Sequence, residues 1–116
     1  MISVEDDHRV SWQEGITMAD LIQNFKESRS FVGAIINGRY VAWSLFGRTK
    51  IPDGAEVRLI PWQEGMTLAD LLNYDIDEGF FSAATVDGRL VPEVDFSKTV
   101  ISTDAEVWLL PPVGGG

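Results

Sequence analysis

Apolar residues follow two patterns along this chain, and each pattern occurs twice. The first has the spacing of a helix with one apolar face, and its members are Met18, Leu21, Ile22 and Phe25, then Leu68, Leu71 and Leu72. The second consists of apolar runs on both sides of a two-residue turn, Asn37-Gly38 and later Asp87-Gly88, which is typical of a β-hairpin. A further apolar strand closes each half, over residues 57–60 and 107–110. The pattern therefore predicts one main helix and several short strands in each half.

Polar residues mark where the two helices begin. Thr17 and Thr67 are suited to act as N-caps, because their hydroxyl oxygens can accept from the first helical amides. Three residues later, Asp20 and Asp70 provide the carboxylate that completes a capping box and complements the positive end of a helix. An opening hairpin is expected only in the first half, where apolar residues lie on both sides of the polar stretch 6–8.

The two halves are copies of one unit, 50 residues apart. Residues 12–21 return as 62–71 with eight of the ten positions identical, and residues 34–41 match 84–91 in the same register. The register still holds where 55–59 matches 105–109. Three matching blocks at one offset identify an internal duplication.

The expected fold class is α+β, with one main helix per repeat packed on a mixed sheet. We place the first repeat at residues 1–60 and the second at 61–116. The second repeat lacks its own opening hairpin, since the residues before its helix already hold the closing strand of the first. Either the strand near 55–60 is shared between the repeats, or another chain supplies the missing strand. A homodimer is one assembly that the sequence allows.

Composition narrows the classes of function. The chain of 116 residues has no cysteine, which excludes disulfides, thiolate metal ligands and a cysteine nucleophile. Its net charge of −9 argues against binding to nucleic acid. No apolar run is long enough to cross a membrane, and the first residues are acidic where a signal peptide would be basic, so a cytoplasmic protein is expected.

The last six residues carry the candidate chemistry, and they read Pro111, Pro112, Val113, Gly114, Gly115 and Gly116. The prolines cannot continue a sheet ladder, so the tail should project from the last strand. Glycine lacks a side chain and accepts many backbone conformations, which suits a tail that threads into a narrow partner site and presents the Gly116 carboxylate. The alternative is a frayed end without function.

The order of strands and helix, together with this tail, resembles the ThiS/MoaD family of ubiquitin-like (β-grasp) sulfur carriers. Residues 86–92 and Phe96 are similar to the ThiS branch, whereas the ending from Leu110 to Gly116 is similar to the MoaD branch. The resemblance implies a tandem β-grasp fold, although family members usually have one unit. It also implies that Gly116 is adenylated and converted to a thiocarboxylate, for thiamine-thiazole or molybdopterin biosynthesis.

The resemblance implies that the chain needs no cofactor. An enzyme is not expected, because the sequence has no cysteine, one histidine in a turn and no metal-type spacing. Its expected partners are a ubiquitin-activating-type adenylating enzyme, which uses the ATP, and a sulfur-accepting synthase. Two alternatives stay open: a ubiquitin-like protein modifier that forms isopeptide bonds through Gly116, and a noncatalytic β-grasp adaptor.

Four side chains outside the tail are candidates for lesser roles. Trp108 has no aromatic counterpart in the first repeat and precedes the tail, so it is a candidate anchor for a partner. Trp12 and Trp62 occupy equivalent positions and are expected to pack against the core or a sheet edge. His8 is expected in a solvated turn rather than as a ligand or base.

Overall fold

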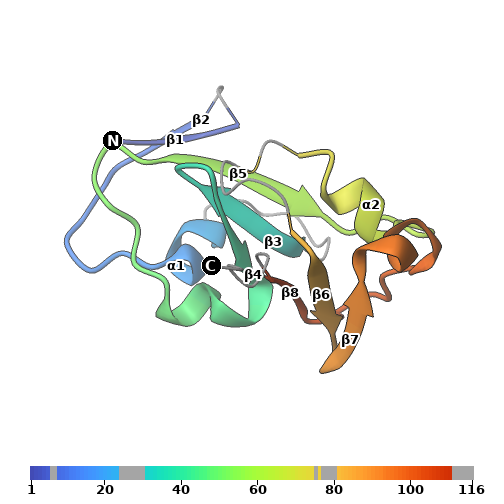
Figure 1. Cartoon of the computed structure of the whole chain (residues 1–116). Coiled ribbons are helices and arrows are strands. Elements are labelled where there is room, and N and C mark those ends of the chain that lie inside the picture. The colour runs from blue at the N-terminus through green and yellow to red at the C-terminus, as the bar shows by residue number, and fades with distance from the viewer. Residues whose placement is uncertain (6–7, 24–30, 75, 77–80, 111–116) are drawn as a thin grey trace, which may run out of the picture.

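A computed structural model of the chain describes residues 1–5, 8–23, 31–74, 76 and 81–110. Strands and helices follow one another in the same order in both halves, apart from the hairpin that opens the first half (Figure 1). The two repeats of the sequence therefore form two similar units, each with a sheet, an α-helix and a 3-10 helix.

The first unit is a five-stranded sheet in the order β2-β1-β5-β3-β4. Its strands are β1 (Ile2–Val4), β2 (His8–Val10), β3 (Phe31–Ile36), β4 (Arg39–Ala42) and β5 (Glu56–Pro61). β1 runs parallel to β5, and the other neighbours are antiparallel. Helix α1 (Met18–Ile22) and the 3-10 helix η1 (Trp43–Arg48) complete the unit.

The second unit is a three-stranded sheet in the order β7-β6-β8. Its elements are helix α2 (Leu68–Leu71), β6 (Ala83–Val86), β7 (Arg89–Pro92), the 3-10 helix η2 (Glu93–Lys98) and β8 (Val107–Leu110). This order reproduces β4-β3-β5 of the first unit, without a counterpart of β1 and β2. The prediction of two α+β units of the β-grasp type is confirmed.

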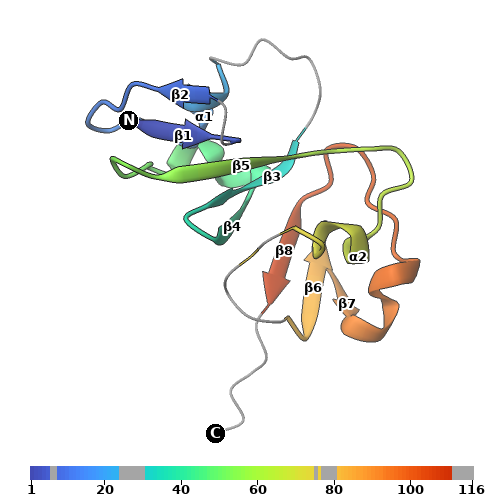
Figure 2. The same ribbon diagram turned by 90° about the horizontal axis from the view of Figure 1, so that it is seen from above.

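The strand near residues 55–60 does not join the two sheets within the part of the chain that the structure describes. β5 pairs with β1 at Glu56 and Val57 on one edge and with β3 on the other, and the second sheet, β7-β6-β8, does not include it. The expectation of a shared strand is therefore wrong for these residues. β5 instead leads directly into the second unit, as Figure 2 shows.

The helix starts are confirmed in detail. In α1 the Thr17 hydroxyl accepts from the Asp20 amide at 3.2 Å, and the Asp20 carboxylate accepts from the Thr17 amide at 3.0 Å. The same box begins α2, with Thr67 and Asp70 at 3.2 and 2.9 Å. Both helices are short, and Phe25, expected on the apolar face of the first, lies outside the described residues.

The predicted hairpin turns are confirmed as well, and the N-terminal one needs a correction. Asn37 and Gly38 have φ values of 51° and 84°, and Asp87 and Gly88 have 51° and 85°, as a two-residue turn of the primed type requires. His8 lies not in the turn but at the start of β2, where it pairs with Val4.

Each unit has its own core, and the two cores differ in origin. The first consists of residues from the first repeat, including Ile2 and Val4 from the opening strand β1. The second core draws on both repeats, because Val32, Ile35 and Ile60 of the first repeat pack into it. Figures 1 and 2 show the consequence: β4 of the first sheet lies beside β8 of the second.

Candidate functional site

The candidate site is the end of β8, from which the tail continues. β8 pairs with β6 along its whole length, from Val86 opposite Val107 to Ala83 opposite Leu110. The Leu110 carbonyl still accepts from the Ser82 amide at 3.1 Å, so regular pairing holds up to the last described residue. The tail residues predicted from the sequence lie outside the described residues, and they are Pro111, Pro112, Val113, Gly114, Gly115 and Gly116.

The face of the second sheet that points away from its core carries exposed apolar side chains. Thr85 pairs with Leu90 on one side and with Trp108 on the other, so these three residues form a row across the face. Leu90 is 64% exposed and Trp108 is 37% exposed. Leu110 lies on the same face, two residues closer to the tail, and is 36% exposed. We call Leu90, Trp108 and Leu110 the apolar outer face.

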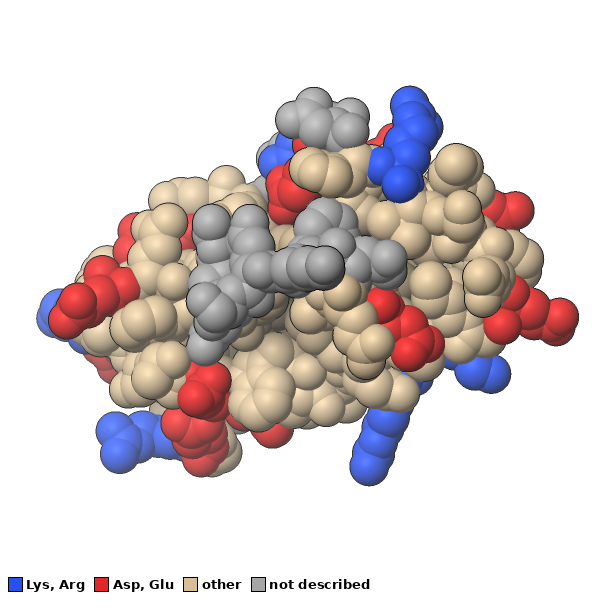
Figure 3. Space-filling model, turned by 180° about the vertical axis from the view of Figure 1, so that it is seen from behind, with Lys and Arg blue, Asp and Glu red and all other residues tan. Residues whose placement is uncertain are grey.

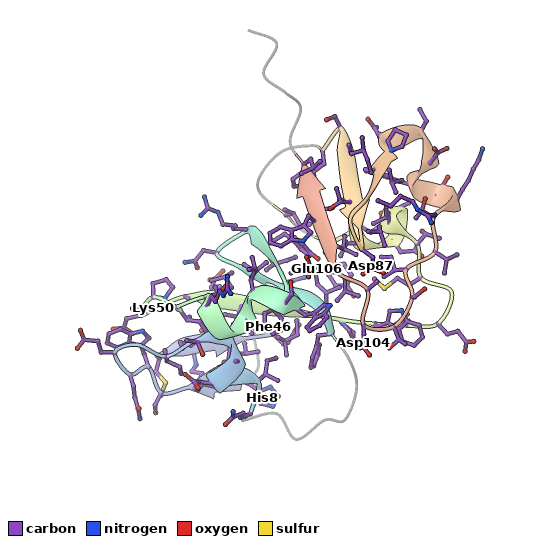
Figure 4. The ribbon with its side chains drawn as sticks, turned by 90° about the horizontal axis from the view of Figure 1, so that it is seen from below. His8, Phe46, Lys50, Asp87, Asp104 and Glu106 are labelled. Carbon is purple, nitrogen blue, oxygen red and sulfur yellow. The ribbon has the colours of Figure 1, made fainter. Side chains whose placement is uncertain are left out.

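Carboxylates border this face at the start of β8. The Trp108 indole donates to the carboxylate of Glu106, and the Glu106 amide donates to the Asp87 carboxylate at 2.9 Å. Figure 4 shows Glu106 and Asp87 next to each other at this end of the sheet. The expected candidate Trp108 thus lies on the surface, held by an acidic neighbour.

Basic side chains do not cluster on the back of the molecule, as far as the structure describes that surface. In Figure 3, Lys and Arg stand singly near the margin, and Asp and Glu lie between them. The net charge of the chain is −9, and the described residues on the face seen in Figure 3 form no basic stripe of the kind that binding to a phosphate backbone requires.

The described residues do not assemble a metal centre. Among them, no group of three or more His, Cys, Asp and Glu side chains lies close enough to hold an ion. His8 lines a hollow of about 620 Å³ beside Arg9, Glu14 and Asp20, and its side chain is exposed there. Within the same ranges no helix has the length and apolar character needed to cross a membrane.

Trp12 and Trp62 have the packing role expected of them. Each is partly buried against the core of its own unit, and each indole donates across 39 residues to a backbone carbonyl, of Ile51 and Ile101 respectively, at 2.7 Å. The indoles therefore fix the segment that runs into each closing strand.

Two residues of the apolar outer face, Leu90 and Leu110, were not singled out from the sequence. A signal was present in the duplication. Their counterparts 50 residues earlier are Tyr40 and Ile60, which are also large and apolar and which pack with the second core. The same sheet face is thus apolar in both repeats, but among the described residues only the face of the first repeat is covered by another part of the chain.

Comparison with known families gives a match in each repeat. The model of the ThiS family matches residues 3–62 and again residues 61–116. Neither the comparison with curated proteins nor that with solved structures gave a match. Members of this family are small ubiquitin-like sulfur carriers rather than catalysts, and they work with an adenylating enzyme and with sulfur-accepting partners. Two family matches in tandem, on two units of the β-grasp type, show that the chain belongs to the ThiS family.

Proposed function

We propose that this protein carries sulfur as a thiocarboxylate on Gly116. The observation that carries the proposal is the contrast between the two closing strands. Ile60 near the end of β5 is fully buried, and the chain continues through Pro61 into the second unit. Its counterpart Leu110 is 36% exposed and is followed by the glycine tail. The glycines on which we propose the activated carboxylate follow the closing strand of the second repeat and not that of the first.

The proposed chemistry takes place in two steps on a partner enzyme. The Gly116 carboxylate attacks the α-phosphorus of ATP, and the bond to pyrophosphate breaks, which leaves an acyl adenylate. A sulfur nucleophile at the oxidation level of hydrosulfide then attacks the acyl carbon. AMP leaves, and the carboxylate oxygen has been replaced by sulfur without net oxidation or reduction. The carrier supplies the acyl group, whereas its partner supplies ATP and the catalytic groups.

The acceptor of the sulfur is the synthase of a cofactor pathway, of the thiamine-thiazole or the molybdopterin type. This part of the proposal rests on the family, together with a tail that combines Pro-Pro-Val with glycines. Because activation requires ATP, we place the reaction in the cytoplasm.

We further propose that the apolar outer face docks the adenylating partner. Trp108 and Leu90 lie in one row across this face, and Leu110 brings it to the base of the tail. Exposed aromatic side chains are frequent energetic anchors of interfaces. Glu106 and Asp87 at the margin favour a partner whose rim carries Lys or Arg. Docking here would place the partner's active site within reach of Gly116.

The activation step is tested by exchange of labelled pyrophosphate into ATP. The full-length chain is incubated with an adenylating enzyme of the ubiquitin-activating type, ATP and magnesium. We expect exchange that depends on the chain and disappears when Gly115 and Gly116 are deleted. Exchange that is equally fast with the deleted chain would contradict the proposal. Exchange followed by attachment of the chain to lysines, without any sulfur, would indicate a protein modifier instead.

A further inference from the structure

β8 is an edge strand of its sheet, although its counterpart in the first repeat is not. In the first unit β1 lies along β5, on the side opposite β3. The second repeat has no strand equivalent to β1 among its described residues, so β8 pairs only with β6. Backbone groups on the open side of β8 would then need other partners to compensate for lost water.

Two side chains of the first repeat take over the hydrogen bonds of the missing strand. In the first unit, the Ser3 amide donates to the Ala55 carbonyl at 2.9 Å and the Glu5 amide donates to the Val57 carbonyl at 3.0 Å. The equivalent carbonyls of the second unit, 50 residues later, are those of Ala105 and Val107. The Trp43 indole donates to Ala105 at 2.9 Å, and the Tyr40 hydroxyl donates to Val107 at 3.0 Å.

Apolar side chains of the first repeat also occupy the place of the missing strand in the core. Ile2 and Val4 of β1 are fully buried in the first core. The second core has no residues from an opening hairpin, and instead contains Val32, Ile35 and Ile60, which are at most 2% exposed. Hydrogen bonds and buried apolar surface are therefore both replaced from the same source.

Only the first repeat has the side-chain donors that replace the hydrogen bonds of the missing strand. At the positions of Tyr40 and Trp43 the second repeat has Leu90 and Glu93, neither of which carries a side-chain donor when Glu93 is ionised. Gly33 is part of the same arrangement, because a Cβ at this position would lie 2.8 Å from the Tyr40 ring and 2.4 Å from the Val41 carbonyl oxygen. The second repeat has Ala83 there.

We propose that the first repeat acts as the opening hairpin of the second, with Tyr40 and Trp43 as the positioning residues that hold β8. The first repeat is then a built-in completing unit rather than a second carrier or a second docking surface. The outer face of the first sheet is buried against the second unit. Among the described residues, the equivalent face of the second sheet is therefore the one that stays open to a partner. The link to the tail rests on the proposed carrier function, whereas the completion of the fold does not.

The test is amide hydrogen exchange on the full-length chain, resolved by residue. The variant is Tyr40→Phe combined with Trp43→Phe, which removes both donors and leaves an aromatic ring, smaller than the indole at position 43, at each position. The informative amides are those of Ser82 and Asp87, which donate to the carbonyls of Leu110, at the end of β8, and of Glu106, the residue before β8. We expect these amides to exchange about tenfold faster or more, which corresponds to the loss of about 1.4 kcal/mol of local stability.

Trp12→Phe is the matched control, since it removes an indole donor to a backbone carbonyl within the first unit. It should speed exchange near Ile51 and leave Ser82 and Asp87 slow. If the double variant does not fold, Tyr40→Phe alone removes only one oxygen atom and provides the same comparison. Unchanged exchange at Ser82 and Asp87 in a folded variant would overturn the proposal, and so would an equal increase at these amides in Trp12→Phe. Neither result depends on whether Gly116 carries sulfur.

Discussion

At the scale of single residues, the duplicated chain assigns its aromatic donors in two ways. Trp12 and Trp62 make equivalent hydrogen bonds in the two repeats, since each indole donates to a backbone carbonyl of its own unit. Tyr40 and Trp43 have no aromatic residue at the equivalent positions of the second repeat, and both donate hydrogen bonds to carbonyls of that repeat. The sequence shows that Trp43 has glutamate, Glu93, at the equivalent position, but it does not show where the Trp43 indole donates its hydrogen bond. The acceptor of this hydrogen bond depends on how the two sheets pack, which a single repeat does not specify.

Tyr40 should make the protein less stable as the pH rises into the alkaline range. Burial raises the pKa of the Tyr40 phenol above its ordinary value, because the charged form loses its hydration. A raised pKa favours the neutral form in the folded state, so its contribution is complete below the unfolded value of about 10 and is lost as the pH rises above it. We expect the free energy of unfolding to fall by up to about 1.4 kcal/mol per pH unit from this group.

The measurement is urea unfolding of the wild type and of Tyr40→Phe at about pH 8 and about pH 11, on either side of the ordinary tyrosine pKa. The variant should show a smaller loss of stability between the two conditions. Equal losses in both proteins would contradict a partly buried Tyr40 that stays neutral in the folded protein.

At the scale of elements, local sequence signals were sufficient wherever an element depends on its own residues. The capping boxes at Thr17 and Thr67 and the two primed turns were predicted and are confirmed. The shared strand was wrong because a strand's neighbours are set by tertiary packing, not by local propensity. One feature of the sequence does indicate how the sheets pack. β3 is apolar at consecutive positions and not at alternate ones, which is typical of a strand buried on both faces.

The capping box of α2 gives a test at this scale. Thr67→Ala removes the hydroxyl that accepts from the Asp70 amide, and a helix of four residues has few other bonds to compensate. We expect the free energy of unfolding to fall by about 1 kcal/mol. Urea unfolding measures the change, with Thr103→Ala, an exposed position outside the helices, as the control. A loss no larger than that of the control, which should stay within about 0.5 kcal/mol, would show that the box does not stabilise α2.

At the scale of the whole molecule, two copies of one unit have become unequal. The outer face of the first sheet is buried against the second unit, and the equivalent face of the second sheet remains exposed as Leu90, Trp108 and Leu110. The tail and Trp108 could be predicted from the sequence, whereas Leu90 and Leu110 could not. The apolar character of a position does not indicate which of the two equivalent sheet faces is covered in the folded chain. The asymmetry follows from the missing hairpin, which exposes the side of the second unit that the first one fills.

The exposed face leads to a prediction about binding. Trp108→Ala should weaken the complex with an adenylating enzyme by about tenfold or more, as expected when an aromatic anchor of an interface is truncated. Titration calorimetry measures the affinity directly. Val94→Ala is the control, because Val94 is 80% exposed but lies on η2, outside the apolar outer face. An equal and small effect of both substitutions would place the docking surface elsewhere.

Gly116 is the proposed site of the sulfur, and mass spectrometry of the intact chain can detect the sulfur there. The chain is incubated with an adenylating enzyme, ATP and a sulfur donor, and the C-terminal fragment is then sequenced in the spectrometer. We predict a mass increase equal to the exchange of one oxygen for one sulfur, located at Gly116, dependent on ATP, and absent when Gly115 and Gly116 are deleted. An unchanged mass in the presence of an enzyme that adenylates the tail, or sulfur found at any other residue, would contradict Gly116 as the sulfur-carrying residue.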